Sequence, residues 1–348
     1  MLKISKERLN ELYEKISEIR CLYIPIKKAG EVNYAVWGEG KEVSLETLKT
    51  VKSPKSAFFP QSENLMKFKT EGKNIEIVDV REKLGEKIDE RPLVLFGVKA
   101  CDYKAIEVLD KVFLSDPVDT YYQMRRESTT IVTLACGKPE ESCFCKAFGI
   151  DATAPQGDVT TWLDENNLYW QANTEKGEAL TALVKDLLVE GGEAEVAAQQ
   201  EAVKVIIDNL PFSNLDLSKF KPENLNELFD APEWEEMSEA CLGCGTCTFV
   251  CPTCQCFDIR DVKTRDGIIR FRCWDSCMYS DFTLMAHGNS RTTQMQRFRQ
   301  RFMHKLVYYP SQNDGLYSCV GCGRCVNKCP QRLNIVKVIK TLGGKNND

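Results

Sequence analysis

A run of twelve residues occurs twice in this chain, at 241–252 (CLGCGTCTFVCP) and at 319–330 (CVGCGRCVNKCP). Each copy has the spacing C-x2-C-x2-C-x3-C-P, in which three cysteines bind one [4Fe–4S] cluster and the fourth binds a neighbouring cluster. Two copies therefore predict two clusters close together, with crossed ligation. Electron transfer is the function that such a pair favours.

Crossed ligation divides eight cysteines between two clusters. We expect cluster 1 to be held by Cys241, Cys244, Cys247 and Cys329, and cluster 2 by Cys319, Cys322, Cys325 and Cys251. Neighbouring glycines let the loops turn and bring backbone N–H groups towards the sulfurs, which influences the reduction potential. Two structural zinc sites are the alternative, but zinc usually takes short C-x2-C pairs rather than three equally spaced cysteines before Cys-Pro.

A third group of cysteines follows two predicted strands. LVLFGV (93–98) and TTIVTLAC (129–136) are apolar runs typical of strands buried on both faces, and a helix is expected between them at 105–113. The carboxyl ends of such parallel strands meet at one sheet edge, where open α/β sheets place their ligands. A third [4Fe–4S] cluster is therefore expected there, on Cys101, Cys136, Cys143 and Cys145. Asp102 is a possible oxygen ligand or hydrogen-bond acceptor; the alternative is a set of unrelated thiols.

The order of elements predicts an α/β domain with a mostly parallel sheet at 1–230, followed by a ferredoxin-like dicluster domain rich in α-helix at 231–348. Sixty-seven residues lie between Cys251 and Cys319 as an insertion in the second domain. Outside the strands already named, we expect an amphipathic helix at 5–20, strands at 158–163 and 167–172, helices at 176–189 and 194–209, and a connector at 210–235.

The insertion contains four more cysteines, Cys254, Cys256, Cys273 and Cys277. Another cluster within it is conceivable, and a ligand role for Cys277 stays open. Their spacing matches neither iron–sulfur run, however, so we interpret them as small buried residues that pack beside the clusters.

The segment 291–305 of the insertion contains no acidic residue. On a helix, Met295, Phe298 and Phe302 would form one stripe, while Arg297, Arg301 and Lys305 would form another. The basic stripe could be a solvated face. It could also dock an acidic partner or raise the potential of a cluster.

Composition narrows the class of protein. Seventeen cysteines without a secretory signal favour metal ligation in the cytoplasm over disulfides, and only two histidines make a self-contained hydrolase improbable. A net charge of −5 argues against a broad nucleic-acid-binding surface, and no apolar stretch approaches the ~20 residues that cross a membrane. Neither G-x-G-x-x-G after a strand nor a P-loop is present, so a flavin, FAD or FMN, is expected on a partner subunit.

Motifs along nearly the whole chain resemble one protein family. They are the two cysteine runs, SPKSAFFPQSE (53–63), FGVKACDYKAIEVLD (96–110), the segment 136–145, CPTCQCFD (251–258), CWDSC (273–277) and RQRFMHK (299–305). The chain resembles the iron–sulfur β subunits of cytoplasmic hydrogenases and sulfhydrogenases, and the corresponding iron–sulfur subunits of anaerobic sulfite reductases. Relatives occur in flavin-dependent and electron-bifurcating complexes. The resemblance implies a relay between a flavoprotein similar to ferredoxin–NADP reductases and a catalytic redox subunit.

Two other functions stay open at the level of sequence. An independent reductase could use an extra cysteine group with an open iron position, although the scarcity of histidine argues against the acid–base chemistry it would need. A structural or nucleic-acid-binding protein could use its clusters only to stabilise the fold.

Overall fold

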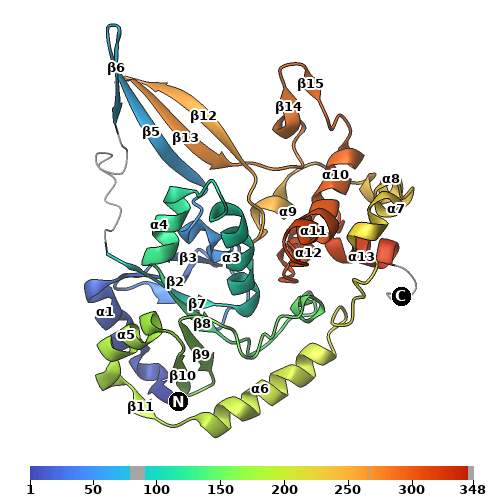
Figure 1. Cartoon of the computed structure of the whole chain (residues 1–348). Coiled ribbons are helices and arrows are strands. Elements are labelled where there is room, and N and C mark those ends of the chain that lie inside the picture. The colour runs from blue at the N-terminus through green and yellow to red at the C-terminus, as the bar shows by residue number, and fades with distance from the viewer. Residues whose placement is uncertain (79–90, 266, 344–348) are drawn as a thin grey trace.

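A computed structural model of the chain describes residues 1–78, 91–265 and 267–343 (Figure 1). Its main sheet has the strand order β11-β1-β10-β9-β8-β7-β2-β3, with β4 paired to β2. The strands are β1 (Leu2–Ser5), β2 (Cys21–Lys28), β3 (Glu31–Val36), β4 (Glu42–Val43), β7 (Leu93–Val98), β8 (Thr130–Leu134), β9 (Val159–Leu163), β10 (Asn167–Ala172) and β11 (Val189–Glu190). The central strands β2, β7, β8 and β9 are parallel, and both flanks are antiparallel. The α/β prediction is confirmed.

Helices cover both faces of this sheet. On one face, α1 (Leu9–Ile19) and α5 (Glu175–Leu183) pack over Val94 and Phe96 of β7. On the other, α3 (Ala100–Phe113) and α4 (Thr120–Ser128) pack over Leu95 and Val98. Burial on both faces explains why β7 is a continuous apolar run. The helix expected at 176–189 is shorter, because a 3₁₀ turn and strand β11 follow α5.

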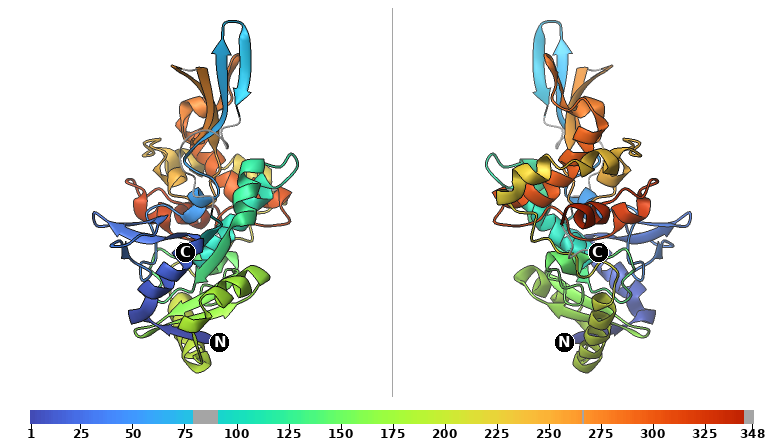
Figure 2. Two further views of the ribbon diagram at one scale, coloured as in Figure 1. Left: turned by 90° about the vertical axis from the view of Figure 1, so that its left-hand side faces the viewer. Right: turned by 90° about the vertical axis from the view of Figure 1, so that its right-hand side faces the viewer.

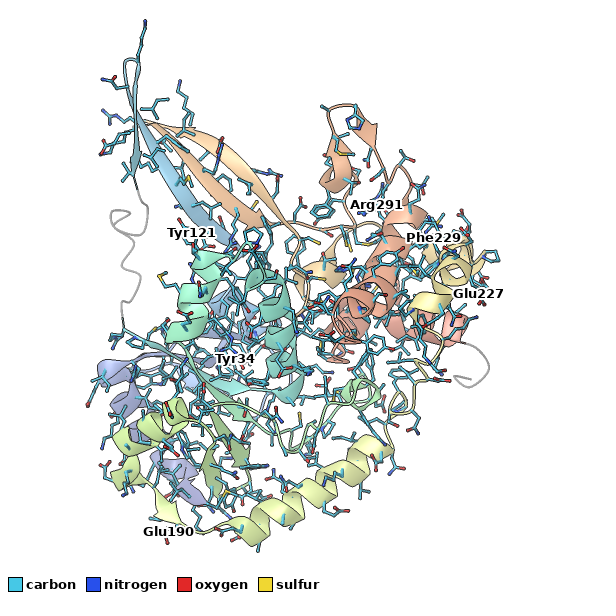
Figure 3. All side chains as sticks on the ribbon, viewed as in Figure 1. Tyr34, Tyr121, Glu190, Glu227, Phe229 and Arg291 are labelled. Carbon is cyan, nitrogen blue, oxygen red and sulfur yellow. The ribbon has the colours of Figure 1, made fainter. Side chains whose placement is uncertain are left out.

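A four-stranded antiparallel sheet projects from the body as an arm (Figures 1 and 2). Its strand order is β12-β13-β5-β6, formed by β5 (Ser62–Glu71), β6 (Asn74–Val78), β12 (Phe257–Thr264) and β13 (Gly267–Trp274). Because β13 pairs with β5, the two predicted domains share this sheet. Tyr121 lies at the foot of the arm (Figure 3), where its hydroxyl donates a hydrogen bond of 2.5 Å to the carbonyl of Leu65.

The rest of the chain is largely helical. Helix α6 (Glu193–Asp208) leads away from the main sheet to a second core, built from helices and the cysteine runs. Its elements are α7 (Leu225–Phe229), α8 (Glu233–Ser238), α9 (Thr246–Phe249), the hairpin β14 (Leu284–Met285) and β15 (Gly288–Asn289), α10 (Gln294–Met303), a π-helical turn (His304–Tyr308), α11 (Tyr309–Gln312), α12 (Arg324–Lys328) and α13 (Ile335–Gly343). In the described residues, none of the helices has the length and apolarity that a membrane span requires.

Candidate metal centres

The four cysteines assigned to cluster 1 line a single pocket. Cys241, Cys244 and Cys247 come from the first run, and Cys329 enters from the second. Phe298 and Phe302 of α10 supply apolar walls, among others. Two donors already point at the sulfurs: the Gln294 amide lies 3.4 Å from Cys241 Sγ, and the Leu333 N–H lies 3.2 Å from Cys329 Sγ. Hydrogen bonds of this kind tune a cluster's potential. Ligation of iron by these four residues stays a prediction, which this geometry favours.

The fourth cysteine of the first run lies with the second run. Burial raises the pKa of Cys322 to about 12, and the charges of Cys251 and Cys325 add to this rise against the opposing effect of Arg324. Cys251 also acts on Cys319. Thr253 holds this junction, because its hydroxyl lies 3.2 Å from Cys251 Sγ and donates to the carbonyl of Ser318 at 2.8 Å. This arrangement favours crossed ligation, which stays a prediction. Buried thiols such as these must lose protons when they bind metal.

The cysteines at the strand ends also line one pocket, which we call the strand-end pocket and define by Cys101, Cys136, Cys143 and Cys145. Cys101 lies in the first turn of α3, after β7, and Cys136 follows β8 by two residues. Strands β7 and β8 are parallel neighbours, so both cysteines reach the same sheet edge. Lys49 and Lys99 share the lining, and Cys322 forms another part of the wall. The strand-end pocket is therefore adjacent to the cluster 2 cysteines.

Asp102 is not among the residues that line this pocket. Its two carboxylate oxygens accept hydrogen bonds of 2.6 and 2.7 Å from the guanidinium of Arg324, and both side chains are buried. Arg324 also donates to the carbonyl of Thr50 at 3.0 Å. This pairing disfavours Asp102 as an oxygen ligand and favours its role as a hydrogen-bond acceptor, and the pair fastens α12 to α3.

Two residues of the basic stripe, Arg301 of α10 and Lys305 of the π-helical turn, face the cysteines rather than solvent. Arg301 and Lys305 are each 3% exposed. Lys305 donates hydrogen bonds of 2.8 Å to Thr253 Oγ1 and to the carbonyl of Ser318, and Arg301 contacts the carbonyl of Cys247. Among the described residues, no carboxylate pairs with either cation. The interpretation as a solvated face is therefore wrong for these two residues, because the apolar stripe and the basic stripe are both buried against the second core.

An unpaired buried cation is costly unless an anion lies nearby. Burial lowers the pKa of Lys305, but the nearby thiolates of Cys251, Cys254 and Cys319 outweigh this effect and raise it. Burial likewise lowers the pKa of Arg301, but the nearby Cys247, Cys325 and Cys254 outweigh this effect and raise it. These surroundings fit a negatively charged group bound by the cysteines of the two runs.

Three of the four cysteines in the insertion lie next to the same region. The nearby Cys251 thiol raises the pKa of Cys254, and the nearby Cys277 thiol lowers the pKa of Cys256 to about 7. Cys273 lies apart, and its neighbours are Arg260, Asp258 and Asp275. A buried lysine from the first domain, Lys55, also reaches this region. Sequence reasoning missed Lys55, because nothing in the local sequence SPK links it to cysteines almost 200 residues away.

Zinc sites require metal-binding side chains that lie closer together than those of the described residues. Tetrahedral zinc holds thiolates at about 2.3 Å from a single ion. Within residues 1–78, 91–265 and 267–343, no three His, Cys, Asp or Glu side chains are placed to hold one metal ion. The cluster 1 cysteines and the strand-end cysteines instead each line a pocket, as a polynuclear cluster requires.

These groups define an iron–sulfur protein of the ferredoxin type. Residues 240–333 match the family model of the 4Fe-4S dicluster domain. Over 346 residues, the chain is 32% identical to sulfhydrogenase 2 subunit beta of Pyrococcus furiosus, and the match covers 97% of each chain. The chain belongs to the family of iron–sulfur β subunits of sulfhydrogenases. No solved structure matches it. It is an iron–sulfur electron-transport component of an oxidoreductase.

Proposed function

We propose that this chain relays single electrons between a flavoprotein subunit linked to NAD(P)H, carrying FAD or FMN, and a catalytic redox subunit. The observation that carries the proposal is the continuity of its cysteine groups. Cys322, assigned to cluster 2, lines the strand-end pocket, and Cys251 joins the first run to the second. A hydrogenase, a sulfite reductase or an electron-bifurcating enzyme is the class of complex expected.

The order of carriers follows from exposure. Cys244 of cluster 1 is exposed, and the adjacent Leu242 is 65% exposed. Cys322 of cluster 2 is buried, as are Cys136, Cys143 and Cys145 of the strand-end pocket. Cluster 1 is therefore the terminal that a partner can approach on this side, with cluster 2 in the middle and a third [4Fe–4S] cluster in the strand-end pocket. When bound, the clusters supply one-electron carriers, and the protein supplies ligands, hydrogen bonds and buried cations.

The arm is a candidate surface for a partner subunit. Strand register places Ile75, Ile77, Met66 and Ile259 on one face, and these side chains are 43–68% exposed. This face also carries the Arg270–Asp261 ion pair, and exposed apolar side chains on a projecting sheet are typical of an interaction surface. The relative's printed name is that of one subunit of an assembly, which supports another subunit of such an assembly as the occupant.

A double substitution that places two positive charges on the apolar side chains of the arm tests this surface. We expect I75K/I77K to abolish co-purification of the partner while iron content stays unchanged. Glu76 is exposed and lies between these two residues, with its side chain on the opposite face, so E76K is a matched control that should retain the partner. Retention of the partner by I75K/I77K would contradict the proposed surface.

We also propose that the chain works in the cytoplasm and that it has two domains. All seventeen cysteines are free, which supports a reducing compartment such as the cytoplasm. We retain 1–230 and 231–348 as the two domains, joined through the arm. With a net charge of −5, we expect no nucleic-acid partner.

One anaerobic purification tests the relay. About eight irons per chain would indicate clusters 1 and 2, and about four more that C136S/C143S removes would indicate a third cluster in the strand-end pocket. We expect dithionite to reduce the clusters of the isolated chain, whereas NAD(P)H should reduce them only when the flavoprotein is added. Substrate turnover by the isolated chain would instead favour an independent reductase. Clusters that resist dithionite, together with salt-dependent DNA affinity, would favour a structural role.

A further inference from the structure

The ends of the β12–β13 hairpin bring together cysteines that neither ferredoxin-type run uses. Cys256 precedes β12 and Cys277 follows β13 by three residues. Phe257 pairs with Trp274, and the Asp275 N–H donates to the carbonyl of Cys256 at 2.9 Å. This closure places Cys256 beside the turn that carries Cys277, and each thiol shifts the pKa of the other.

A third thiol belongs to the same place. Cys254 is two residues before Cys256, and the nearby Cys251 and Cys256 both raise the pKa of its thiol. We call Cys254, Cys256 and Cys277 the hairpin thiol group. Cys273, by contrast, is on β13 between the buried side chains of Arg272 and Trp274, so the alternation of a strand turns it to the opposite face.

Lys55 is the independent observation that points to an anionic ligand here. Its side chain is 3% exposed, and Nζ donates to the carbonyl of Cys254 at 2.8 Å and lies 3.9 Å from the centre of the Trp274 ring. No carboxylate of the described chain forms an ion pair with it. A buried ammonium group without a carboxylate requires another source of negative charge.

We propose that the hairpin thiol group binds an additional iron–sulfur cluster beside cluster 2, with Lys55 as its buried counter-charge. Three thiolates suit a cluster with three cysteine-bound irons, either a [3Fe–4S] cluster or a [4Fe–4S] cluster with one corner free of cysteine. The proposal rests on the proposed iron–sulfur function. It revises our interpretation of Cys254, Cys256 and Cys277 as packing residues and retains that interpretation for Cys273.

Iron and acid-labile sulfide counts on the anaerobically purified full chain, read with electron paramagnetic resonance, test the proposal. We expect C256S/C277S to lose about three or four irons relative to the wild type, while the signals of reduced clusters 1 and 2 remain. C273S removes a cysteine from the same hairpin and should lose none. An unchanged iron count in C256S/C277S would overturn the proposal, as would a Cys256–Cys277 disulfide in the air-free wild type.

A second variant keeps every thiol, so it still tests the proposal if C256S/C277S fails to fold. K55Q should retain the iron and lower the reduction potential of the signal that C256S/C277S lacks, because the positive charge that favours the reduced form is gone. No shift in that signal would contradict the role of Lys55. Failure of the relay itself is distinguishable, because it is measured by reduction of the clusters through NAD(P)H and the flavoprotein, on which the iron count of C256S/C277S does not depend.

Discussion

The two cysteine runs have the same local form in different surroundings. Gly243 and Gly321 hold equivalent positions with φ of 63° and 60°, and Gly245 and Gly323 precede short helices with φ of 71° and 75°. The first loop borders solvent at Leu242 and Cys244, whereas the second is pressed against the loop of the strand-end pocket. The repeat therefore determines how iron is bound, and the surroundings determine whether a cluster exchanges electrons with a partner or within the chain.

Substitution of the equivalent glycines should show the largest difference in stability between the two runs. A Cβ at Gly321 would lie 2.4 Å from the backbone carbon and oxygen of Phe144, whereas one at Gly243 would meet only the flexible side chain of Gln294, at 3.1 Å. We expect G321A to prevent cluster 2 from assembling and to cost more than about 5 kcal/mol or abolish folding. G243A should cost about 1–2 kcal/mol, the strain of its left-handed backbone.

Circular dichroism melts and iron counts of both variants would measure the contrast. Equal losses in G243A and G321A would mean that the two loops have equally tolerant surroundings, against the difference described above.

Crossed ligation predicts the next largest effect. C329S should remove cluster 1 and C251S should remove cluster 2, each with a loss of about four irons, while residues 1–230 stay largely folded. Iron counts and the spectra of the reduced protein distinguish the two. If C329S instead removed cluster 2, with the exposed cluster intact, each run would hold its own cluster and the crossed assignment would be wrong.

The buried pair Asp102–Arg324 supplies a smaller effect in the second run. Arg324 and Thr246 hold the same position in the two runs, but Thr246 contacts only Cys244 through a long hydrogen bond. R324M leaves Asp102 buried without its cation and should destabilise the protein by about 3–5 kcal/mol. T246A should change stability by less than about 1 kcal/mol. Chemical denaturation under anaerobic conditions measures both, and a small effect of R324M would show that α12 is not fastened through this pair.

How far the sequence predicts the molecule depends on the range of the interactions. The spacing of the runs and the apolar pattern of β7 and β8 are local, so the cysteine groupings and the parallel centre of the sheet could be predicted. The orientation of Arg301 and Lys305 depends on which side of α10 meets the second core. Lys55 and the pairing of β5 with β13 depend on contacts between residues about 200 positions apart, which no local pattern records.

The smallest expected effect concerns the potential of cluster 2 relative to cluster 1. Lys305 is buried next to Cys251 and Cys319, whereas Arg297, two turns earlier, is only partly buried and contacts Gln294 and the carbonyl of Arg291. K305M removes a positive charge from a region of low dielectric constant, which makes the reduced cluster less stable. We expect the potential of cluster 2 to fall by about 60 mV, equivalent to about 1.4 kcal/mol for one electron. R297M should leave it unchanged.

Redox titration followed by electron paramagnetic resonance measures the potential of each cluster separately, in K305M and in R297M. Because Lys305 also donates to Thr253 and Ser318, its loss alone could loosen the junction, and K305R keeps the charge as a control. A fall in K305M that K305R restores assigns the effect to charge. An equal fall in both variants would assign it to the lost hydrogen bonds, and the buried cations would then hold the runs together without setting the direction of electron flow.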